Sequence, residues 1–505
     1  MSDSVRIELQ PLNESVEVKR GTPLKDVLFA YGVEFPCGGH GRCRRCRVRL
    51  LKGNLPITKE QEAVLDRSEL AAGWRLACHS AVEDEVTLEI AQWETSILDD
   101  RSRFDFVPGE GLGVAIDLGT TTVVAQLLDL RTAHVLAVRT ALNSQAAHGA
   151  DVMSRVQYAA TQHGQKRLEW LIRQEIGLLL EQLQVVARRR GGAIRQVVVV
   201  GNTVMHHLFC GVDVEPLSHA PFHPHEDGLK VFSASEFNWE LDGNPAVRFL
   251  PCLGGFVGSD ILAGILATKL HENDELQVLV DLGTNGEIVV GNRERMLCAS
   301  TAAGPAFEGG GILMGMRAAT GAIAEVELEN GGIRCVILGN VAPRGICGSG
   351  LVDAVAAGLE LGRILPTGRF SDRAAEWMLA EPVSLSQCDI RGLQLAKGAI
   401  SAGIRILLRQ WRARIEDVTR LYLAGAFGNY VSRASARRIG LIDFPEEKVQ
   451  PAGNTALLGA KLALFGGFTG DGSFGEIRSR VQHVPLASDP EFEDTYIADM
   501  RFPSA

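Results

Sequence analysis

The stretch GVAIDLGTTTVVAQLLDL at residues 113–130 decides the fold of most of this chain, because a similar stretch, LQVLVDLGTNGEIVVGN, follows at residues 276–292. Each stretch reads as an apolar strand, a glycine-containing turn and a second apolar strand, which is the pattern of a β-hairpin. The cores DLGTTTVV and DLGTNGEI align without a gap. One DLGT sequence alone is typical of any hairpin turn, whereas its repetition predicts two halves that share one architecture.

The two turns carry residue types that bind phosphate. Gly119 and Gly283 let the backbone turn sharply and bring N–H groups onto phosphate oxygens. The polar side chains that add hydrogen-bond donors there are Thr120, Thr121, Thr122, Thr284 and Asn285. We therefore expect the two hairpins to face a phosphate-bearing ligand.

Asp117 and Asp281 occupy the same position in the two copies. A carboxylate repels phosphate, so these side chains suit such a site only with a divalent cation beside the phosphates. Mg²⁺ with most of its waters retained is the usual cation. We expect one aspartate to hold the hydrated Mg²⁺ and the other to orient an attacking water, which makes both of them candidate catalytic residues.

Two facing hairpins of this kind resemble those of the actin, sugar-kinase and heat-shock-chaperone ATPases, which share an α/β, two-lobed, ribonuclease H-like fold. Four further segments follow the order of that family: a late strand of the first half at 194–203, inter-lobe helices at 251–266 and 453–464, and an adenosine-binding strand and turn at 421–430. The resemblance spans about residues 111–465 and implies ATP as the ligand. It places Gly425, Ala426 and Gly428 beside the nucleotide.

Two glycine-rich segments, residues 300–316 and 345–359, open onto apolar stretches. They suit helix N-termini that face the nucleotide phosphates, and equally they suit close helix packing, so both interpretations stay open. The histidines of HAPFHPHE, residues 219–226, are separated by prolines and indicate a surface loop rather than a metal site. His206 and His207 follow a predicted strand and indicate a structural role.

Four cysteines near the N-terminus, Cys37, Cys43, Cys46 and Cys78, have the spacing C-x5-C-x2-C-x31-C, and three of them share the loop CGGHGRCRRC. Four thiols with three on one tight loop indicate a metal site, because the ligands of a small cluster must lie close together. Around them the sequence predicts two strands, a helix, the cysteine loop, a strand, a short helix and a closing strand.

This order and this spacing resemble the α+β, β-grasp ferredoxins, and the longer first gap is similar to that of the adrenodoxin and putidaredoxin branch. The resemblance implies a 2Fe–2S cluster held by all four thiolates. Structural zinc on the same thiolates is the alternative, but zinc sites usually use two C-x2-C pairs and only Cys43 and Cys46 form one. An absorption spectrum separates the two possibilities.

The chain is thus expected to consist of a ferredoxin domain at 1–94, a linker at 95–110 and an ATPase domain at 111–505, with duplicated lobes at about 111–272 and 273–465 and a C-terminal tail. The linker has no clear period and ends in Pro108 and Gly109, which favours a tether between domains. The alternative is a strap that packs on the body through Trp93, Phe104 and Phe106.

Composition excludes some classes of function. The net charge is −10 and no long basic block is present, which argues against a nucleic-acid partner. No stretch approaches the about 20 apolar residues of a membrane span, so no membrane association is expected. The N-terminus, MSDSVRIELQ, lacks the basic and apolar regions of a signal peptide, so we expect a cytoplasmic protein.

A ferredoxin fused to this ATPase fold, together with DLGTTT, DLGTNGE, AAGPAFEGG, GICGSGL and LAGAFG, resembles the reductive activators of corrinoid proteins. The resemblance implies ATP-dependent transfer of one electron to a Co(II) corrinoid, which regenerates Co(I) for methyl transfer. The implied partners are a corrinoid protein of a methyltransferase system and an upstream electron donor, while a homodimer is left open. Ser300, beside the second hairpin, is a candidate partner-facing residue.

Two other functions are weighed against this one. An ATP-gated donor to another low-potential acceptor, as in the radical dehydratase activators, would use a cluster that bridges an ATPase dimer rather than four cysteines in a separate module. A redox-sensing ATP-binding regulator or chaperone would need a peptide-binding domain, and the tail at residues 466–505 is too short for one.

Overall fold

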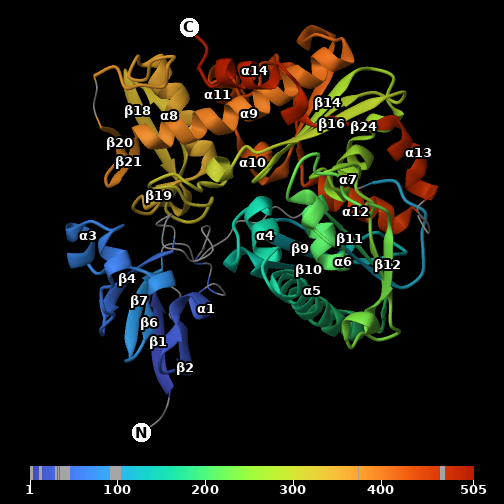
Figure 1. Ribbon diagram of the computed structural model, residues 1–505, viewed down its shortest axis with the longest axis horizontal. Coiled ribbons are helices and arrows are strands. Elements are labelled where there is room, and N and C mark those ends of the chain that lie inside the picture. The colour runs from blue at the N-terminus through green and yellow to red at the C-terminus, as the bar shows by residue number, and fades with distance from the viewer. Residues whose placement is uncertain are drawn as a thin grey trace.

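The computed structural model describes residues 4–10, 14–28, 31, 33, 46–90, 104–372, 375–466 and 472–504. Cys37, Cys43 and Trp93 lie outside these residues. The described chain forms three bodies, which Figure 1 shows as a small N-terminal domain in blue, a first lobe in teal and green, and a second lobe in yellow to red.

The N-terminal domain is a five-stranded mixed sheet in the order β2-β1-β7-β4-β5. Its strands are β1 (Ser4–Gln10), β2 (Glu14–Lys19), β4 (Arg47–Lys52), β5 (Trp74–Leu76) and β7 (Val86–Ile90). The helices are α1 (Leu24–Leu28), α2 (Lys59–Glu62) and α3 (Arg67–Ala71), and β3 (Thr22–Pro23) pairs with β6 (Ala81–Val82). Alternate residues of β1 are buried in one core with α1, as the period of the sequence predicted. This is the β-grasp architecture expected from the sequence.

The first lobe contains a six-stranded sheet in the order β10-β9-β8-β11-β13-β12. Its strands are β8 (Leu112–Leu118), β9 (Thr122–Asp129), β10 (Val135–Leu142), β11 (Ile194–Gly201), β12 (Lys230–Ser233) and β13 (Ala246–Phe249). Its helices are α4 (Val152–Ala159), α5 (Gly164–Arg189) and α6 (Thr203–Cys210). The apolar face of α5 packs on this sheet in the core of the lobe.

The second lobe contains a six-stranded sheet in the order β23-β22-β14-β15-β16-β24. Its strands are β14 (Gln277–Leu282), β15 (Gly286–Gly291), β16 (Met296–Thr301), β22 (Arg420–Ala424), β23 (Val449–Gly453) and β24 (Val481–His483). The helices around it are α9 (Gln387–Trp411), α10 (Gly425–Tyr430), α11 (Arg433–Arg438), α13 (Gly472–Arg480) and α14 (Phe492–Asp499).

Five strands of each sheet have the same order and directions. In the first sheet, β8 pairs antiparallel with β9 and parallel with β11. In the second sheet, β14 pairs antiparallel with β15 and parallel with β22 in the same way. The duplicated DLGT turns therefore end equivalent strands, and the two-lobed actin-like fold class predicted from the sequence is confirmed.

Two helices connect the lobes. Helices α7 (Ser259–Thr268) and α12 (Thr455–Phe465) share one core with residues of β8 and β11 from the first sheet and of β14 and β15 from the second. Each helix follows the last parallel strand of its lobe, β13 or β23. Both hairpin turns are thereby held at the same side of the molecule, on opposite walls of one cleft.

An inserted subdomain extends the second lobe between β16 and α9. It consists of β17 (Ala322–Glu329), β18 (Gly332–Ile337), β19 (Gly345–Ile346), α8 (Gly348–Glu360), β20 (Glu376–Ala380) and β21 (Val383–Ser386). Figure 1 shows it in yellow and orange above the N-terminal domain. Helix α8 is buried over almost its whole length, which explains its small and apolar residues.

The end of the linker lies on the body. Phe104 and Phe106 pack edge-on against Phe465 of α12, with ring centroids 5.4 and 5.1 Å away. This end of the linker therefore packs on the body, as the strap interpretation predicted. Trp93, the remaining aromatic of that prediction, lies outside the described residues.

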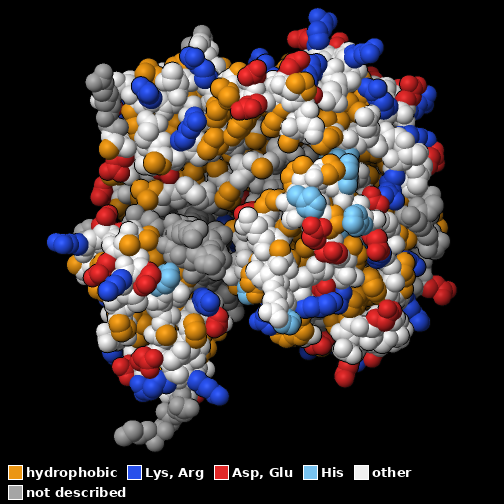
Figure 2. Space-filling model, viewed as in Figure 1, with side chains coloured by type: hydrophobic (Ala, Val, Ile, Leu, Met, Phe, Trp, Pro, Cys, Tyr) orange, Lys and Arg blue, Asp and Glu red, His pale blue; other side chains and the backbone are white. Residues whose placement is uncertain are grey.

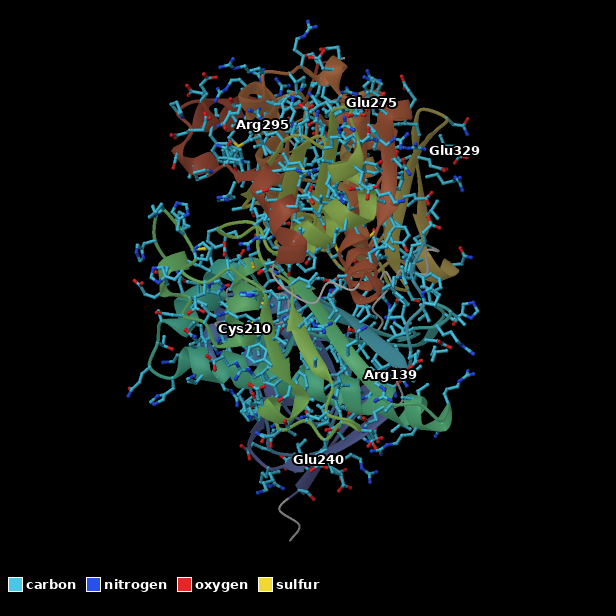
Figure 3. All side chains as sticks on the ribbon, turned by 90° about the vertical axis from the view of Figure 1, so that its right-hand side faces the viewer. Arg139, Cys210, Glu240, Glu275, Arg295 and Glu329 are labelled. Atoms are coloured by element: carbon cyan, nitrogen blue, oxygen red, sulfur yellow. The ribbon has the colours of Figure 1, made fainter. Side chains whose placement is uncertain are left out.

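On the face seen in Figure 2, acidic and basic side chains of the described residues are intermixed. Figure 3, turned by 90°, separates the lobes: Glu275 and Arg295 lie in the upper one, and Arg139, Cys210 and Glu240 lie in the lower one. Among the described residues, no helix combines the length and the apolar character that a membrane crossing needs.

Candidate functional site

A cavity of about 260 Å³ lies between the lobes. Most of the residues predicted to bind the nucleotide line it: Asp117, Gly119, Thr120, Thr121, Thr122, Asp281, Gly283, Thr284, Asn285 and Gly425. The structure thus brings both DLGT turns and the predicted adenosine turn to a single site.

The first turn is held from behind by side chains that do not line the cavity. The Asn143 side chain donates to the carbonyl of Gly119 at 2.9 Å, and its backbone N–H donates to the carbonyl of Thr121 at 2.9 Å. The guanidinium of Arg155, which is fully buried, donates to the carbonyl of Thr120. Burial lowers the pKa of Arg155 to about 9, so the group still carries its charge at neutral pH. These bonds fix the turn in one conformation.

The two turns touch across the cleft. The hydroxyl oxygens of Thr121 and Thr284 lie 3.2 Å apart. Both hydroxyls also donate to the carboxylate of Glu308, Thr121 to Oε2 at 3.3 Å and Thr284 to Oε1 at 3.0 Å. Glu308 ends the short 3₁₀ helix Pro305–Glu308 in the glycine-rich segment 300–316. The sequence analysis did not single it out.

Four further carboxylates crowd the cavity. Burial raises the pKa of Asp117 to about 6, against a hydrogen bond from the Asn454 side chain at 2.9 Å that lowers it. Burial, and then the charge of Asp117, raises the pKa of Asp281 to about 7. Burial, and then the charge of Asp281, raises the pKa of Asp260 to about 8. Burial, and then the charges of Asp260 and Asp281, raises the pKa of Glu287 well above its usual range.

Burial is the main cause of these raised pKa values, and the charges of neighbouring carboxylates add to it at Asp260, Asp281 and Glu287, so a cation in the cavity would stabilise the charged forms. Among the described residues no three His, Cys, Asp or Glu side chains are grouped closely enough to bind a metal ion directly. The donor set therefore fits a hydrated Mg²⁺ whose waters contact the carboxylates. Asp260 and Glu287 are added to the predicted pair Asp117 and Asp281. In the sequence, the only indication of either residue is the motif that contains it, GSD for Asp260 and DLGTNGE for Glu287.

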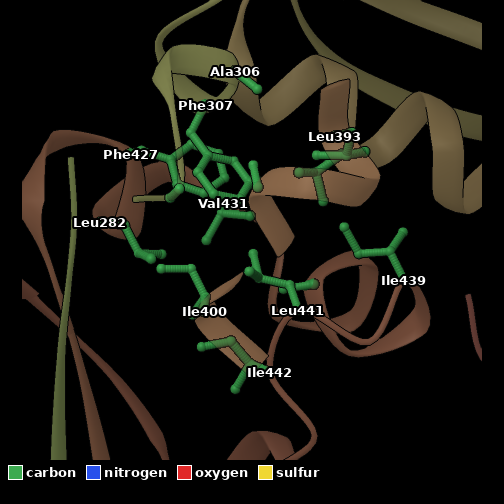
Figure 4. Packing of buried hydrophobic residues seen from close by; sticks show 14 of the residues in the cluster. Leu282, Ala306, Phe307, Leu393, Ile400, Phe427, Val431, Ile439, Leu441 and Ile442 are labelled. Atoms are coloured by element: carbon green, nitrogen blue, oxygen red, sulfur yellow. The ribbon is translucent and has the colours of Figure 1, made fainter. Parts of the chain in front are cut away.

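An aromatic pair closes one end of the cavity. Phe307 stacks on Phe427 of α10, with ring centroids 4.6 Å apart and planes inclined by 20° (Figure 4). Gly425 has a φ of +83°, and a Cβ added there would lie 2.6 Å from Oδ1 of Asp281, so only glycine suits this turn. Gly428 is buried one turn along α10, against Leu423, and is not among the residues that line the cavity, so its predicted contact with the nucleotide stays a prediction.

Ala426 belongs to the same short helix, but its side chain lies outside the described set. Ser300 of β16 is half-buried, and its hydroxyl donates to Oε1 of Glu287 at 3.3 Å. That contact turns Ser300 toward the carboxylates of the cavity. Its predicted role toward a partner stays a prediction.

The segment 345–359 both reaches the cavity and packs closely against its neighbours. Cys347, Gly348 and Ser349, at the N-terminus of α8, line the cavity. A Cβ on Gly348 would lie 1.8 Å from the carbonyl oxygen of Phe307, so the same glycine also permits close packing. Helix α8 therefore begins at the cavity wall and rests on the residue that precedes Glu308.

The histidines predicted to be structural are fully buried in α6, whereas those at 219, 223 and 225 are exposed. The exposed three form no metal-binding group with other described residues.

The described part of the predicted metal centre brings two thiols together. The Sγ atoms of Cys46 and Cys78 lie 3.2 Å apart, well beyond the about 2.0 Å of a disulfide and close enough to bind one iron. The backbone N–H of Ala77 donates to the carbonyl of Cys46 at 2.9 Å. The buried Gln61 donates to the carbonyl of His79 at 3.0 Å. These bonds hold the turn with Cys78 against Cys46, while Cys37 and Cys43 lie outside the described residues.

Comparison with protein families accounts for nearly the whole chain. Residues 7–83 match the "2Fe-2S iron-sulfur cluster binding domain". Residues 112–273 match the "RACo middle region", and residues 275–505 match the "C-terminal domain of RACo the ASKHA domain". The two lobes thus correspond to two separate family models.

Individual relatives cover the same length. The "Corrinoid activation enzyme RamQ" of Eubacterium limosum is 30% identical, over 99% of each chain. The "Co(II) methylated amine-specific corrinoid protein reductase" of Methanosarcina barkeri is 27% identical, over 77% of each. A solved structure, "Reductive activator for corrinoid, iron-sulfur protein", is 27% identical with a TM-score of 0.69 and covers 99% of this chain and 98% of its own. The chain therefore belongs to the family of reductive activators of corrinoid proteins.

Proposed function

We propose that this protein transfers one electron to the Co(II) corrinoid of a partner protein and uses ATP to do so, which yields the Co(I) form that accepts methyl groups. The observation that carries this proposal is the combination of a thiolate centre with a two-hairpin cavity in one chain. Both parts are matched along their full length by a relative named as a corrinoid activation enzyme.

The thiolates of Cys37, Cys43, Cys46 and Cys78 would hold a 2Fe–2S cluster, and the close approach of Cys46 to Cys78 supports this assignment. When bound, such a cluster accepts and releases single electrons near about −400 mV in plant-type ferredoxins. An upstream electron donor is required to return the electron that leaves for cobalt. The arginines of the cysteine loop and Arg47 favour an anionic centre on electrostatic grounds.

The cavity residues would bind MgATP. The threonine hydroxyls and the glycine turns would donate to the phosphates, and Asp117 and Asp281 would hold the hydrated Mg²⁺ and orient the attacking water. Gly425 leaves room for the nucleoside at the aromatic end. Because the site is made from both lobes, nucleotide binding is able to change the angle between them.

ATP is needed because Co(I) forms only at very low potential. Each 30 mV by which the donor falls short costs about 0.7 kcal/mol for one electron. His148 lies in the segment between Asn143 and Arg155, which hold the first turn. Burial, and next the charge of Arg167, lowers the pKa of His148, and the charge of Lys25 in α1 of the N-terminal domain lowers it further.

Stopped-flow reduction of a Co(II) corrinoid protein, with and without MgATP, tests the proposal. Cys46→Ser is expected to abolish reduction while MgATP binding persists, because neither Cys46 nor Cys78 lines the cavity. Asp281→Asn is expected to keep the visible absorption of the cluster and to lose ATP-stimulated reduction. Reduction by the wild-type protein that is equally fast without nucleotide would show that ATP has no part in the reaction.

A further inference from the structure

Glu308 joins the two phosphate-binding turns. Its two carboxylate oxygens accept one hydrogen bond each, from Thr121 of the first lobe at 3.3 Å and from Thr284 of the second at 3.0 Å. The two hydroxyl oxygens are themselves 3.2 Å apart. We refer to Thr121, Thr284 and Glu308 as the Glu308 bridge.

The bridge shows what kind of group this point of the cavity accepts. Two hydroxyl donors from opposite walls converge on a pair of anionic oxygens, which is the arrangement that one phosphate group would also satisfy. The hydroxyls are too close together to admit a phosphate between them while the carboxylate remains in place. A nucleotide phosphate and the Glu308 carboxylate therefore compete for the same donors.

We propose that Glu308 occupies the place of the terminal phosphate and must leave it when a nucleoside triphosphate binds, an inference that rests on the proposed nucleotide site. Glu308 is then a specificity-determining residue. A triphosphate has to displace the carboxylate, whereas a diphosphate, which lacks the terminal group, leaves the bridge intact. Part of the binding free energy of the terminal phosphate is used to break the bridge.

The surrounding backbone allows this displacement. The segment that carries Glu308 is bounded by Gly304, with a φ of +79°, and Gly309, with a φ of +74°. Glycines of this kind absorb backbone rotation with little steric cost. The carboxylate is thus attached to a short element with a glycine at each end.

The displacement would reach two other parts of the second lobe. Phe307, the neighbour of Glu308, stacks on Phe427 of α10 (Figure 4). Its carbonyl oxygen also lies against Gly348 at the N-terminus of α8. Helix α8 packs against β17 of the inserted subdomain. A change at Glu308 is therefore transmitted to the helix N-terminus that lines the cavity and to the subdomain behind it.

Equilibrium binding of Mg-AMP-PNP and MgADP to the full-length protein tests the inference. Glu308→Gln retains the size of the side chain and removes its charge, so the affinity for Mg-AMP-PNP is expected to rise about tenfold and that for MgADP to stay within about twofold. Glu308→Asp, which keeps the charge but shortens the reach, is expected to shift the triphosphate affinity in the same direction by less. Glu325→Gln, at an exposed position of β17, is the matched control and should change neither affinity.

The outcomes separate the two proposals. An unchanged or weakened Mg-AMP-PNP affinity in Glu308→Gln would overturn the inference, because Glu308 would then be neutral to the nucleotide or help to hold it. An equal gain for both nucleotides would also overturn it, since the effect would not be specific to the terminal phosphate. Absence of binding of either nucleotide to the wild-type protein would refute the proposed nucleotide site itself.

Discussion

Two buried histidines in the first lobe make its stability sensitive to acid. His206 and His207 are fully buried in α6. His206 Nε2 lies 3.1 Å from the carbonyl of Gly228, and His207 Nδ1 lies 2.8 Å from that of Thr203, so both imidazoles act as neutral donors. Burial, and then the charge of His207, lowers the pKa of His206 to about 3. Burial lowers the pKa of His207 to about 4, against the hydrogen bond to Thr203.

The sign of the effect follows from these values. Both folded pKa values lie below the unfolded value of about 6.5, so below pH 6.5 the unfolded chain takes up protons that the folded chain refuses. The contribution of the two histidines to the free energy of unfolding is therefore greatest above pH 6.5, and it declines with falling pH until the folded pKa values are reached. Between pH 7 and pH 5 the loss is about 2 kcal/mol for each histidine, or about 4 kcal/mol for the pair. For a lobe of this size that corresponds to a fall in Tm of roughly 10 °C.

Thermal unfolding of the wild-type protein and of His206→Gln/His207→Gln, each at pH 7 and pH 5, measures this loss. The double variant is expected to start from a lower Tm and to lose much less on acidification, because it has no imidazole to protonate. The raised pKa values of Asp117, Asp260 and Asp281 act in the opposite direction, but they are common to both proteins and cancel in the comparison. An equal acid shift in both proteins would refute the assignment to these histidines.

Two further predictions concern the cavity. Asn454→Ala should destabilise the protein by about 1 kcal/mol, because Asn454 caps α12, and weaken Mg-AMP-PNP binding, because it also donates to Asp117. Thermal unfolding and nucleotide titration follow the two effects, and Asn454→Ser, which keeps a capping oxygen without the amide donor, should show only the second. Gly425→Ala should weaken Mg-AMP-PNP binding at least about tenfold, because its Cβ would meet Asp281 at 2.6 Å and its φ of +83° disfavours any side chain. Gly475→Ala in α13, where a Cβ meets nothing within 4 Å, is the control, and equal affinities in the two glycine variants would contradict the steric argument.

The parts of the fold that could be predicted are those whose information is local. The DLGT turns and their flanking apolar residues indicate hairpins by themselves, and equivalence of the two copies then implies equivalent sheets, as found for β8–β9 and β14–β15. The strands around the cysteines were predicted from local patterns in the same way. Pairing of β4 with β5 returns the chain so that Cys78 meets Cys46 across the turn, although 31 residues separate them.

The residues that sequence reasoning missed depend on distant partners. The position of Asn454 before an apolar helix indicates a cap, but nothing local shows that its amide also reaches Asp117 in the other lobe. Glu308 lies among glycines in a segment without period, and its role follows only from the meeting of both lobes. Gly428 is the reverse case, because its motif alone does not indicate what packs against it. It lies in a predicted nucleotide motif, yet it faces the strand it follows rather than the cavity.

The same cavity favours contact between the two lobes. Five carboxylates, those of Asp117, Asp260, Asp281, Glu287 and Glu308, face a volume of about 260 Å³. Four of them repel one another, but Glu308 gains two hydroxyl donors by joining the lobes. A triphosphate without a cation adds negative charge to these carboxylates and finds the two hydroxyl donors already bound to Glu308. MgATP brings a cation that reduces the repulsion and a terminal phosphate that takes the place of the Glu308 carboxylate. On this reasoning the cation and the terminal phosphate act together, so Mg²⁺ should matter far more to triphosphate binding than to the binding of a nucleoside monophosphate.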